Sequence, residues 1–468
     1  MIWNNPKFRK HSAAANKDKP DHIVVDNIAI FDGTGSNTYD SGRLSIKDGR
    51  ILAIGPKETV EIPTGSYIID GRGMTALPGM IDAHVHLSWN GVFEAYPFLF
   101  GESLAKRLSR NAWFTLKSGV TTAREMPGFG ALKLKQSIEQ GEVAGPRLLV
   151  STSALTVRGG YFAYPLWGTV IKDAGKIPEI IRKKTQSKCD FIKTVAPHSD
   201  ALRMETNISP ALLSEIVREA NASGFSVAAH TMWADGLEAA IDAGVSSLEH
   251  CPCYVGGVME DTVFDKAKEK GTFFVPTADV LRRNYMIFND KDLLLEEDEY
   301  HQNMPSKSLR KMLKMAEKVE KAQQMKHEIK DAFRNLFKSY REDYPINFRK
   351  ALDYGIRIAA GTDAGVNYTP HGILPKELAL YVKLGMTARQ AILSATKTGA
   401  ELLGLEQEIG TLEQGKKADI ILAKGNPLKD ITDLQNLHCV MKDGVIVYSS
   451  EWDGLSLNFS SPGNRLVF

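Results

Sequence analysis

Eight short apolar runs recur through the middle of the chain, and each is followed by a segment with helical character. They cover residues 75–84, 120–125, 147–153, 191–196, 226–230, 246–250, 272–276 and 357–363. Continuous apolar runs of this length are typical of parallel strands that helices bury on both faces. Eight such strand–helix units predict an α/β fold of the (β/α)8 TIM-barrel type. Gly119, Gly244 and Gly355 precede three of the runs, where a glycine commonly ends a helix.

Two similar hairpin patterns lie near opposite ends of the chain. Apolar and polar residues alternate around Asp48-Gly49 and again around Asp443-Gly444, and this dipeptide is a strong hairpin signal. The two patterns predict one small β-sandwich domain built from both chain ends. The predicted boundaries are 21–73 and 410–450 for this domain, 74–409 for the barrel, and 1–20 and 451–468 for two tails.

Residues 281–345 are far longer than a connection between two barrel elements requires. They are rich in Lys, Glu, Met and Leu with a helical period. We expect a helical insertion here. Three roles are open for it: additional packing against the barrel wall, a lid, or a subunit contact in a homo-oligomer.

The composition excludes several classes of protein. Lys and Arg number 58 against 56 Asp and Glu, and a net charge of +2 gives no electrostatic footprint for nucleic acid or an anionic membrane. No apolar stretch is long enough for a transmembrane helix, and the first residues lack the apolar core of a secretory signal. Four cysteines in 468 residues are not a disulfide framework. We therefore expect a cytoplasmic protein that acts on small molecules.

Chemically active side chains lie at the ends of four of the apolar runs and within a fifth, and in a barrel we expect them to converge on the active face. They are His84, His86, Lys193, His230, His250 and Asp363. His84 and His86 alternate along one strand, so both imidazoles can reach the same ion. Imidazole and carboxylate are the usual ligands of zinc and related divalent ions. The sequence therefore predicts a metal centre at the barrel mouth.

Lys193 is the unusual member of this set, because a free ammonium group would repel a cation. Its amine would suit a metal centre if CO2 converted it to a carbamate, an anionic group that can bridge two ions. Alternatives for an isolated lysine are an ammonium paired with a carboxylate, or the Schiff-base lysine of an aldolase-type barrel. The four histidines at neighbouring strand ends favour the carbamate.

The order His-x-His, Lys, His, His, Asp resembles the amidohydrolase superfamily in its subtype with two metal ions. The resemblance extends to Pro78-Gly-Met-Ile-Asp-Ala-His-Val-His86, Ser247-Leu-Glu-His250, Gly361-Thr-Asp-Ala-Gly365 and residues 411–422. Residues 121–125, 145–147 and 347–352 are most similar to the branch of prolidases and imidazolonepropionases. The mononuclear imidazolonepropionases lack the bridging lysine, so Lys193 argues against that activity.

The resemblance implies two divalent ions, which we expect to be zinc. His84, His86 and Asp363 would hold the more buried ion, His230 and His250 the second, and carboxylated Lys193 would bridge them. A water activated by the metals would attack the scissile carbonyl. Asp363 would take its proton and later deliver it to the leaving amine. His250 and Tyr254 would complete the catalytic groups, with Tyr254 donating to the oxyanion.

Other residues that follow strand ends are candidates for substrate binding. Arg158 and Tyr161 surround a pair of glycines, in a loop suited to clamping a substrate carboxylate. The remaining candidates are His198, Trp233, Tyr254, Tyr368 and His371. For Arg158 and His198 a position in a solvent-facing loop is the alternative, and for Tyr254 a position in the core.

We therefore expect a hydrolase of amide-type C–N bonds in dipeptides, including Xaa-Pro, or in N-acyl amino acids. Cyclic amides, lactones, carbamates and ureas are the alternative substrates on the same centre. A catalytically silent scaffold is a more distant alternative, since such proteins typically lose ligands and all six positions are filled here.

Overall fold

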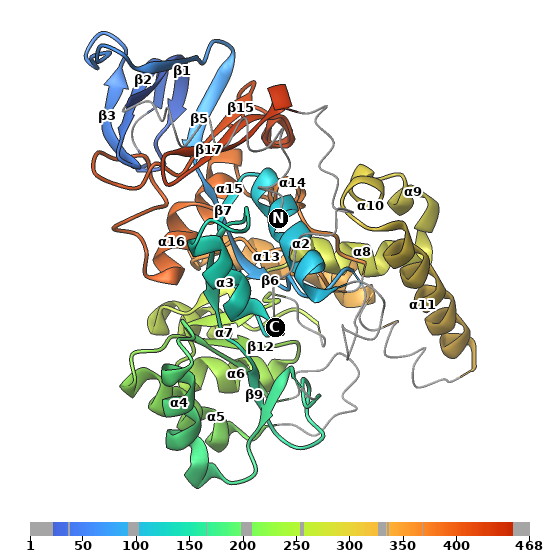
Figure 1. The fold of residues 1–468 in the computed structure, drawn as a ribbon. Coiled ribbons are helices and arrows are strands. Elements are labelled where there is room, and N and C mark those ends of the chain that lie inside the picture. The colour runs from blue at the N-terminus through green and yellow to red at the C-terminus, as the bar shows by residue number, and fades with distance from the viewer. Residues whose placement is uncertain are drawn as a thin grey trace.

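The computed structural model describes residues 22–35, 38–91, 103–164, 166–197, 208–252, 257–325, 334, 337–366 and 368–452. Strands from the two ends of the chain lie together at one end of the molecule, and the remaining strands and helices lie below them (Figure 1). Among the described helices, none is both long and apolar enough to cross a membrane.

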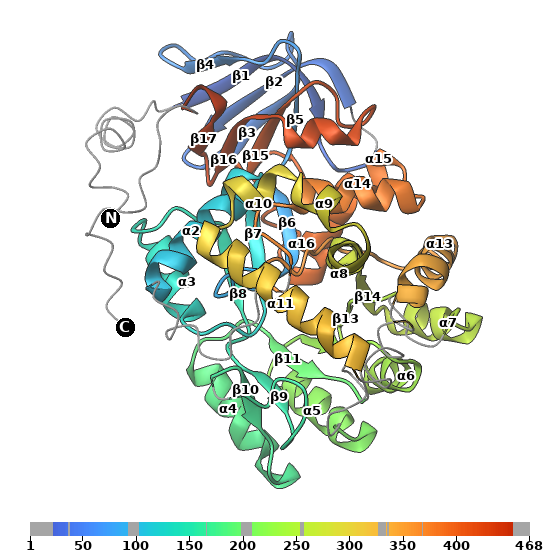
Figure 2. The same ribbon diagram turned by 90° about the vertical axis from the view of Figure 1, so that its right-hand side faces the viewer.

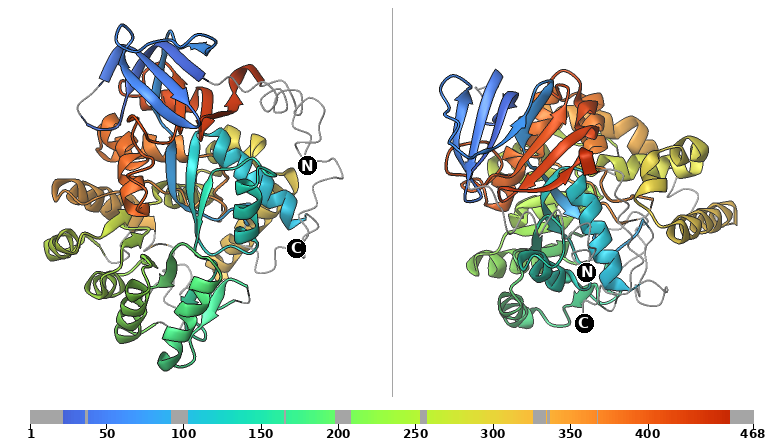
Figure 3. Two further views of the ribbon diagram at one scale, coloured as in Figure 1. Left: turned by 60° about the vertical axis from the view of Figure 1, so that its left-hand side comes forward. Right: turned by 45° about the horizontal axis from the view of Figure 1, so that its top comes forward.

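One mixed sheet combines strands from both ends of the chain (Figure 3). Its members are β1 His22–Phe31, β2 Thr38–Lys47, β3 Arg50–Pro56, β4 Tyr67–Asp70, β5 Met74–Pro78, β15 Ile420–Lys424, β16 Leu437–Lys442 and β17 Val445–Ser449. The order is β17-β16-β15-β5-β1-β2-β3, with β4 beside β1. Strand β5 joins the two groups, since Leu77 lies opposite Ile421 of β15. Because the strands pair within one sheet, the structure does not show the two sheets of the expected sandwich.

The two predicted Asp-Gly turns contact each other. A Cβ built on Gly444 would lie 2.6 Å from the Cα of Gly49, and both glycines have a positive φ, of 72° and 80°. A side chain at either position would therefore meet both a strained backbone and the opposite turn. The contact shows that the sheet curls until its two outer hairpins touch, around a core that includes Leu44, Ile420 and Met441.

Parallel strands below this sheet form two groups. The first contains β6 Met80–Val85, β7 Val120–Glu125 and β8 Arg147–Val150. The second contains β9 Ala154–Thr156, β10 Gly168–Val170, β11 Ile192–Val195, β12 Val227–His230, β13 Ser247–Glu249 and β14 Phe273–Val275. The expected first run, 75–84, was wrong as a single strand, because it divides at Gly79 into β5 of the mixed sheet and β6. A Cβ at Gly79 would lie 2.3 Å from Thr121 Oγ1, so only glycine fits at this crossing.

Residues 357–364 connect the two groups, although they form single bridges rather than a regular strand. Ile358 pairs with Phe274 of β14, and Ala364 pairs with Val85 of β6. The amide of His86 donates to the carbonyl of Ala364 at 2.8 Å. At the opposite junction the amide of Asp190 donates to the carbonyl of Val150, also at 2.8 Å. The eighth predicted run thus lies beside the first strand of the parallel set.

Helices follow the parallel strands and cover their outer side (Figure 1). They are α2 Leu104–Lys117, α3 Ala131–Glu139, η3 Ala174–Lys176, α4 Ile177–Gln186, α5 Pro210–Ala222, α6 Ala234–Ala243, α7 Asp261–Lys270, α13 Tyr344–Asp353, α14 Leu374–Leu384, α15 Ala388–Ser394 and α16 Lys397–Leu403, with short turns η5 Ile431–Gln435 and η6 Ser450–Trp452. Helix α5 is typical: Ser209 caps its first turn, and it buries Leu213, Ile216 and Ala220 at helical spacing.

A helical segment follows β14 and projects to one side (Figures 1 and 2). It comprises α8 Ala278–Asn289, α9 Lys291–Leu295, α10 Asp298–Gln302, α11 Ser306–Met325 and the π-helix η4 Ser339–Asp343. Two hydrogen bonds attach it to the loop after residue 364: Tyr300 donates to the carbonyl of Tyr368 at 2.5 Å, and Asn303 to that of His371 at 2.8 Å. The segment therefore packs against a loop at the active end of the parallel strands.

Candidate metal centre

Three predicted ligands lie together at the ends of β6 and the 357–364 segment. One ligand atom each from His84, His86 and Asp363 lies within 4.8 Å of the other two. Oδ1 of Asp363 is 3.2 Å from Nε2 of His84 and 3.3 Å from Nε2 of His86. Burial opposes ionisation of Asp363, but the neighbouring His84 and His86 hold its pKa well below the usual value. The group is a buried, anionic, nitrogen- and oxygen-bearing site.

The other three predicted ligands adjoin this group. The ring of His250 lies 4.9 Å from that of His84 and 4.5 Å from that of His230, between centroids. Lys193 comes from β11, beside the strand of His230. Burial, and then the charge of Arg124, lower the pKa of Lys193 to about 8, although Glu249 and Asp363 act in the opposite direction. A substantial part of this amine is therefore neutral near pH 8.

Three histidines of the centre have lowered pKa values, so their neutral form, which can bind a metal, is favoured. Burial lowers the pKa of His86, lowers that of His230 further, and brings that of His250 to about 3. A neutral imidazole keeps the lone pair that a metal requires.

Three buried atoms of the centre have no hydrogen-bond partner among the described residues. They are Nζ of Lys193, Nε2 of His230 and Oδ1 of Asp363. A buried polar atom without a partner is costly, and most such atoms in proteins are satisfied. Imidazole and carboxylate atoms that lack hydrogen-bond partners, with the amine of Lys193 beside them, are suited to binding divalent cations. The residues present therefore suit the metal that the sequence predicts.

The outer nitrogens of three histidines each have a partner. Nδ1 of His84 lies 2.6 Å from Glu249 Oε2, Nδ1 of His86 lies 3.3 Å from the carbonyl of Pro127, and Nδ1 of His250 lies 2.8 Å from Thr277 Oγ1. Contacts of this kind orient histidine ligands and tune their basicity. The sequence reasoning missed Glu249 and Thr277. Glu249 could have been found, because it stands between Leu248 and His250 in a strand end already recognised.

The backbone is strained at three positions around the centre. His250, Thr277 and Asp363 have φ values of +68°, +46° and +56°. Non-glycine residues adopt this region at a cost of about 1–3 kcal/mol each, and such residues cluster at functional sites. His250 and Thr277 come just after β13 and β14, and Asp363 lies in the 357–364 segment.

Two buried carboxylates lie just outside the centre. Asp82 accepts from the amide and the hydroxyl of Thr362, at 3.0 and 2.7 Å, and so ties β6 to the 357–364 segment. Burial raises its pKa to about 6. Glu125 accepts from the amide of Leu87 at 2.8 Å, and burial raises its pKa well above the usual value.

Aromatic rings surround the histidines on one side. Trp89 stacks on His86 with centroids 4.5 Å apart and planes 12° apart. Tyr161 lies 4.5 Å from the ring of His230, and Phe162 meets the same ring edge-on at 6.3 Å. Trp89 and Phe162 are buried, whereas Tyr161 is half-buried and Arg158 is exposed. Of these three aromatic rings, that of Tyr161 is thus the one partly accessible to solvent.

The other predicted substrate residues are not gathered at one point. His371 is buried, with Nε2 3.0 Å from the carbonyl of Trp89. Tyr368 is buried against Phe288 of α8. Trp233 is half-buried and precedes α6. His198 and Tyr254 lie outside the described residues.

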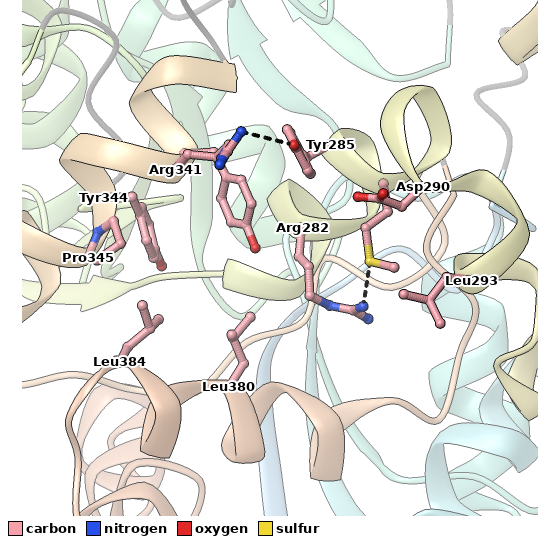
Figure 4. Close-up of a pocket in the computed structure, with 11 residues that line it drawn as sticks. Arg282, Tyr285, Asp290, Leu293, Arg341, Tyr344, Pro345, Leu380 and Leu384 are labelled. Atoms are coloured by element: carbon pink, nitrogen blue, oxygen red, sulfur yellow. Dashed lines mark hydrogen bonds between the residues drawn. The ribbon is translucent and has the colours of Figure 1, made fainter.

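A separate cavity of about 440 Å3 lies between α8, η4, α13 and α14 (Figure 4), and none of the six predicted metal ligands lines it. Its lining is largely apolar and aromatic, and its charged members are Arg282, Arg341 and Asp290. Arg341 donates to the hydroxyl of Tyr285 at 3.3 Å. Arg282 pairs with Asp279 and Glu297, so its charge is already compensated.

Comparison with known proteins gives a consistent result. A profile of the amidohydrolase family matches residues 75–447. Ochratoxinase from Aspergillus niger is 27% identical, over 97% of this chain and 90% of its own length. Imidazolonepropionase from Alkaliphilus metalliredigens is 22% identical, over 87% of this chain and 90% of its own. The crystal structure of a Xaa-Pro dipeptidase with bound methionine superposes with a TM-score of 0.71 at 28% identity, over 92% of this chain and all of the other.

Proposed function

We propose, from the premise that this chain belongs to the amidohydrolase family, that it cleaves dipeptides or N-acyl amino acids. Membership of the family implies a TIM-barrel α/β fold. It also makes the chain a metal-dependent hydrolase that acts on C–N bonds. The observation that carries the reaction type is the buried cluster of His84, His86 and Asp363, with Lys193, His230 and His250 adjoining it. The names of two relatives, an ochratoxinase and a Xaa-Pro dipeptidase, support an amide or peptide substrate.

Within this proposal the six residues divide between two divalent ions, expected to be zinc. His84, His86 and Asp363 would hold one ion, His230 and His250 the other, and Lys193 would bridge them as a carbamate. The bound ions would lower the pKa of a water and polarise the scissile carbonyl.

The carbamate needs a neutral amine at position 193. The Lys193 nitrogen would form a bond to the carbon of CO2 and release one proton. With a pKa near 8, roughly a tenth of this amine is neutral at pH 7. Its Nζ has no hydrogen-bond partner among the described residues. Carbamate formation would therefore not require an existing hydrogen bond of this nitrogen to break.

Asp363 would carry protons during the reaction. Its Oδ1 faces the two histidines and has no hydrogen-bond partner among the described residues. A carboxylate in this position would accept a proton from the attacking water and pass it to the nitrogen of the leaving amine.

The substrate side of the proposal rests on one loop. Tyr161 is half-buried against His230, and Arg158 is exposed three residues earlier. An aromatic surface beside the metal centre, with a guanidinium near its outer edge, would suit an apolar amino acid or acyl group with a free carboxylate.

The test is amine release from a panel of dipeptides and N-acyl amino acids, with Asp363→Asn as the blank. Each substrate is supplied with a free and with an amidated carboxyl group. In Arg158→Gln the KM should rise about tenfold for the free acids and stay unchanged for the amides. Arg182→Gln, at an exposed arginine of α4, is the matched control.

Two results would redirect the proposal. Silence across the panel, in protein that holds two ions per chain, would exclude these substrates and leave cyclic amides, lactones, carbamates and ureas. Full activity of the metal-stripped protein would refute the metal mechanism and restore the lysine-aldolase alternative.

A further inference from the structure

Glu249 lies at the centre of a buried network behind His84. Its Oε1 accepts from Arg124 at 2.8 Å and from the hydroxyl of Ser247 at 2.5 Å. Its Oε2 lies 2.6 Å from Nδ1 of His84. Arg124 is itself fixed, because its Nε donates to the carbonyl of Ala83 at 2.7 Å. All four side chains are at most 2% exposed.

The direction of each hydrogen bond in this network follows from chemistry. Arg124 can only donate, and it donates to Oγ of Ser247 at 3.1 Å as well as to Glu249. The hydroxyl proton of Ser247 is therefore directed to Oε1. The guanidinium group of Arg124 and the carboxylate of Glu249 form a buried ion pair, with 2.8 Å between Nη2 and Oε1. An ionised carboxylate can only accept, so Nδ1 of His84 must carry a proton.

We propose that Glu249 is a positioning residue that fixes the tautomer of His84, so that the lone pair of Nε2 points toward Asp363 and His86. The inference deepens the proposed function, on which it rests for the role of His84 as a metal ligand. Glu249 touches neither substrate nor reacting atoms; it acts through His84.

The two other histidines with a contact at Nδ1 differ from His84. His86 lies against a backbone carbonyl, which no side-chain substitution can remove. His250 lies against the hydroxyl of Thr277, which can donate or accept. Of the three contacts, the one at His84 is made by an ionised side chain, and it can be reversed by one substitution.

That substitution is Glu249→Gln. Arg124 and Ser247 both donate, so the amide oxygen of the glutamine would take the position of Oε1. Its NH2 group would then face Nδ1 of His84 at the position of Oε2. A donor there requires Nδ1 to accept, which moves the proton of His84 to Nε2 and blocks the atom that would bind the metal.

The experiment uses full-length protein with 15N-labelled histidine, loaded with cadmium-113, and reads one-bond cadmium–nitrogen couplings. In the native protein Nε2 of His84 should couple to cadmium while Nδ1 carries a proton; His84→Asn identifies the signals. In Glu249→Gln this coupling should disappear, and cadmium affinity, measured by chelator competition, should fall about 10- to 100-fold.

Glu125→Gln is the control, because the same change is made at another buried carboxyl group, which accepts a hydrogen bond from the backbone amide of Leu87. It should leave the His84 coupling intact. An unchanged coupling and affinity in folded Glu249→Gln would overturn the proposal. So would equal losses in both variants, since that would indicate a general effect on the core.

A second variant guards against loss of the fold, since Arg124 loses its buried counter-charge in Glu249→Gln. Glu249→Asp keeps the charge beside Arg124 but withdraws the carboxylate from His84. Cadmium affinity should again fall, by about tenfold, and unchanged affinity would contradict the role of Glu249. Neither readout depends on turnover, so failure to find a substrate would not bear on this result.

Discussion

The two halves of the metal centre differ in how far the protein alone holds them in place. In the first half, Glu249 and Pro127 contact the outer nitrogens of His84 and His86, and Asp363 lies between their inner nitrogens. In the second half, Nζ of Lys193 and Nε2 of His230 have no hydrogen-bond partner among the described residues. The first half thus has more protein contacts than the second, where His250 is held at Nδ1 by Thr277. This difference predicts unequal affinities for two ions and unequal responses to substitution.

Asp363→Asn should have the largest effect, because Asp363 belongs to the first half and also carries the proton. We expect about a thousandfold loss of kcat with most of the metal retained, since an amide oxygen can still act as a ligand. The measurements are steady-state kinetics and metal analysis on the same preparation. A rate within tenfold of the native enzyme would remove Asp363 from the mechanism.

Lys193→Ala should affect mainly the second half of the metal centre. Without the bridging group, metal content should fall from two ions per chain toward one, and activity by about a hundredfold. Addition of a short carboxylic acid should restore part of both. Unchanged metal content would count against the carbamate.

Thr277→Ala should have a smaller effect, since it removes only the contact at Nδ1 of His250. We expect about a tenfold weaker affinity for the second ion, measured by chelator competition. Thr272→Ala, at the opposite end of the same strand, is the control: its hydroxyl is also buried, and it bonds the carbonyl of Val245. Equal losses in both variants would assign the effect to the strand rather than to His250.

The smallest expected effect is a dependence on pH. The pKa of Lys193 lies near 8, below the usual value for lysine, so its neutral fraction increases with pH. From pH 7 to pH 8 that fraction increases about fivefold. Reactivation of the metal-stripped protein by zinc at constant dissolved CO2 should accelerate by the same factor, as followed by amine release. A rate that does not change between pH 7 and pH 8 would contradict carbamate formation by the neutral amine.

The sequence could predict that the six candidate ligands lie close together, because their positions depend on where the strands end. The spacing of His84 and His86, and single residues at the ends of later runs, were enough to predict it. The contacts around the centre were less predictable. Thr277, which contacts His250, has a left-handed backbone conformation, and no local sequence pattern predicts that conformation. Whether Tyr161 or Arg158 meets substrate stays a prediction.

The boundaries of the strands were harder to predict than their existence. Pro78-Gly79 lies within one apolar run, yet it separates strands of two different sheets. The run at 357–363 is as apolar as the others but forms only single bridges. Apolar periodicity reports burial, and burial is shared by regular strands, irregular segments and crossings between sheets.

The pairing of β5 with β15 has a consequence for synthesis of the protein. Leu77 finds its partner Ile421 only after the whole barrel has been translated. At about 5–20 residues per second, that delay amounts to tens of seconds on the ribosome. Throughout it, β5 presents an unpaired edge, which is the kind of surface that chaperones bind and that misassembles between nascent chains. The barrel can therefore begin to fold as it is translated, but the sheet beside it must wait until the segment 420–442 has left the exit tunnel.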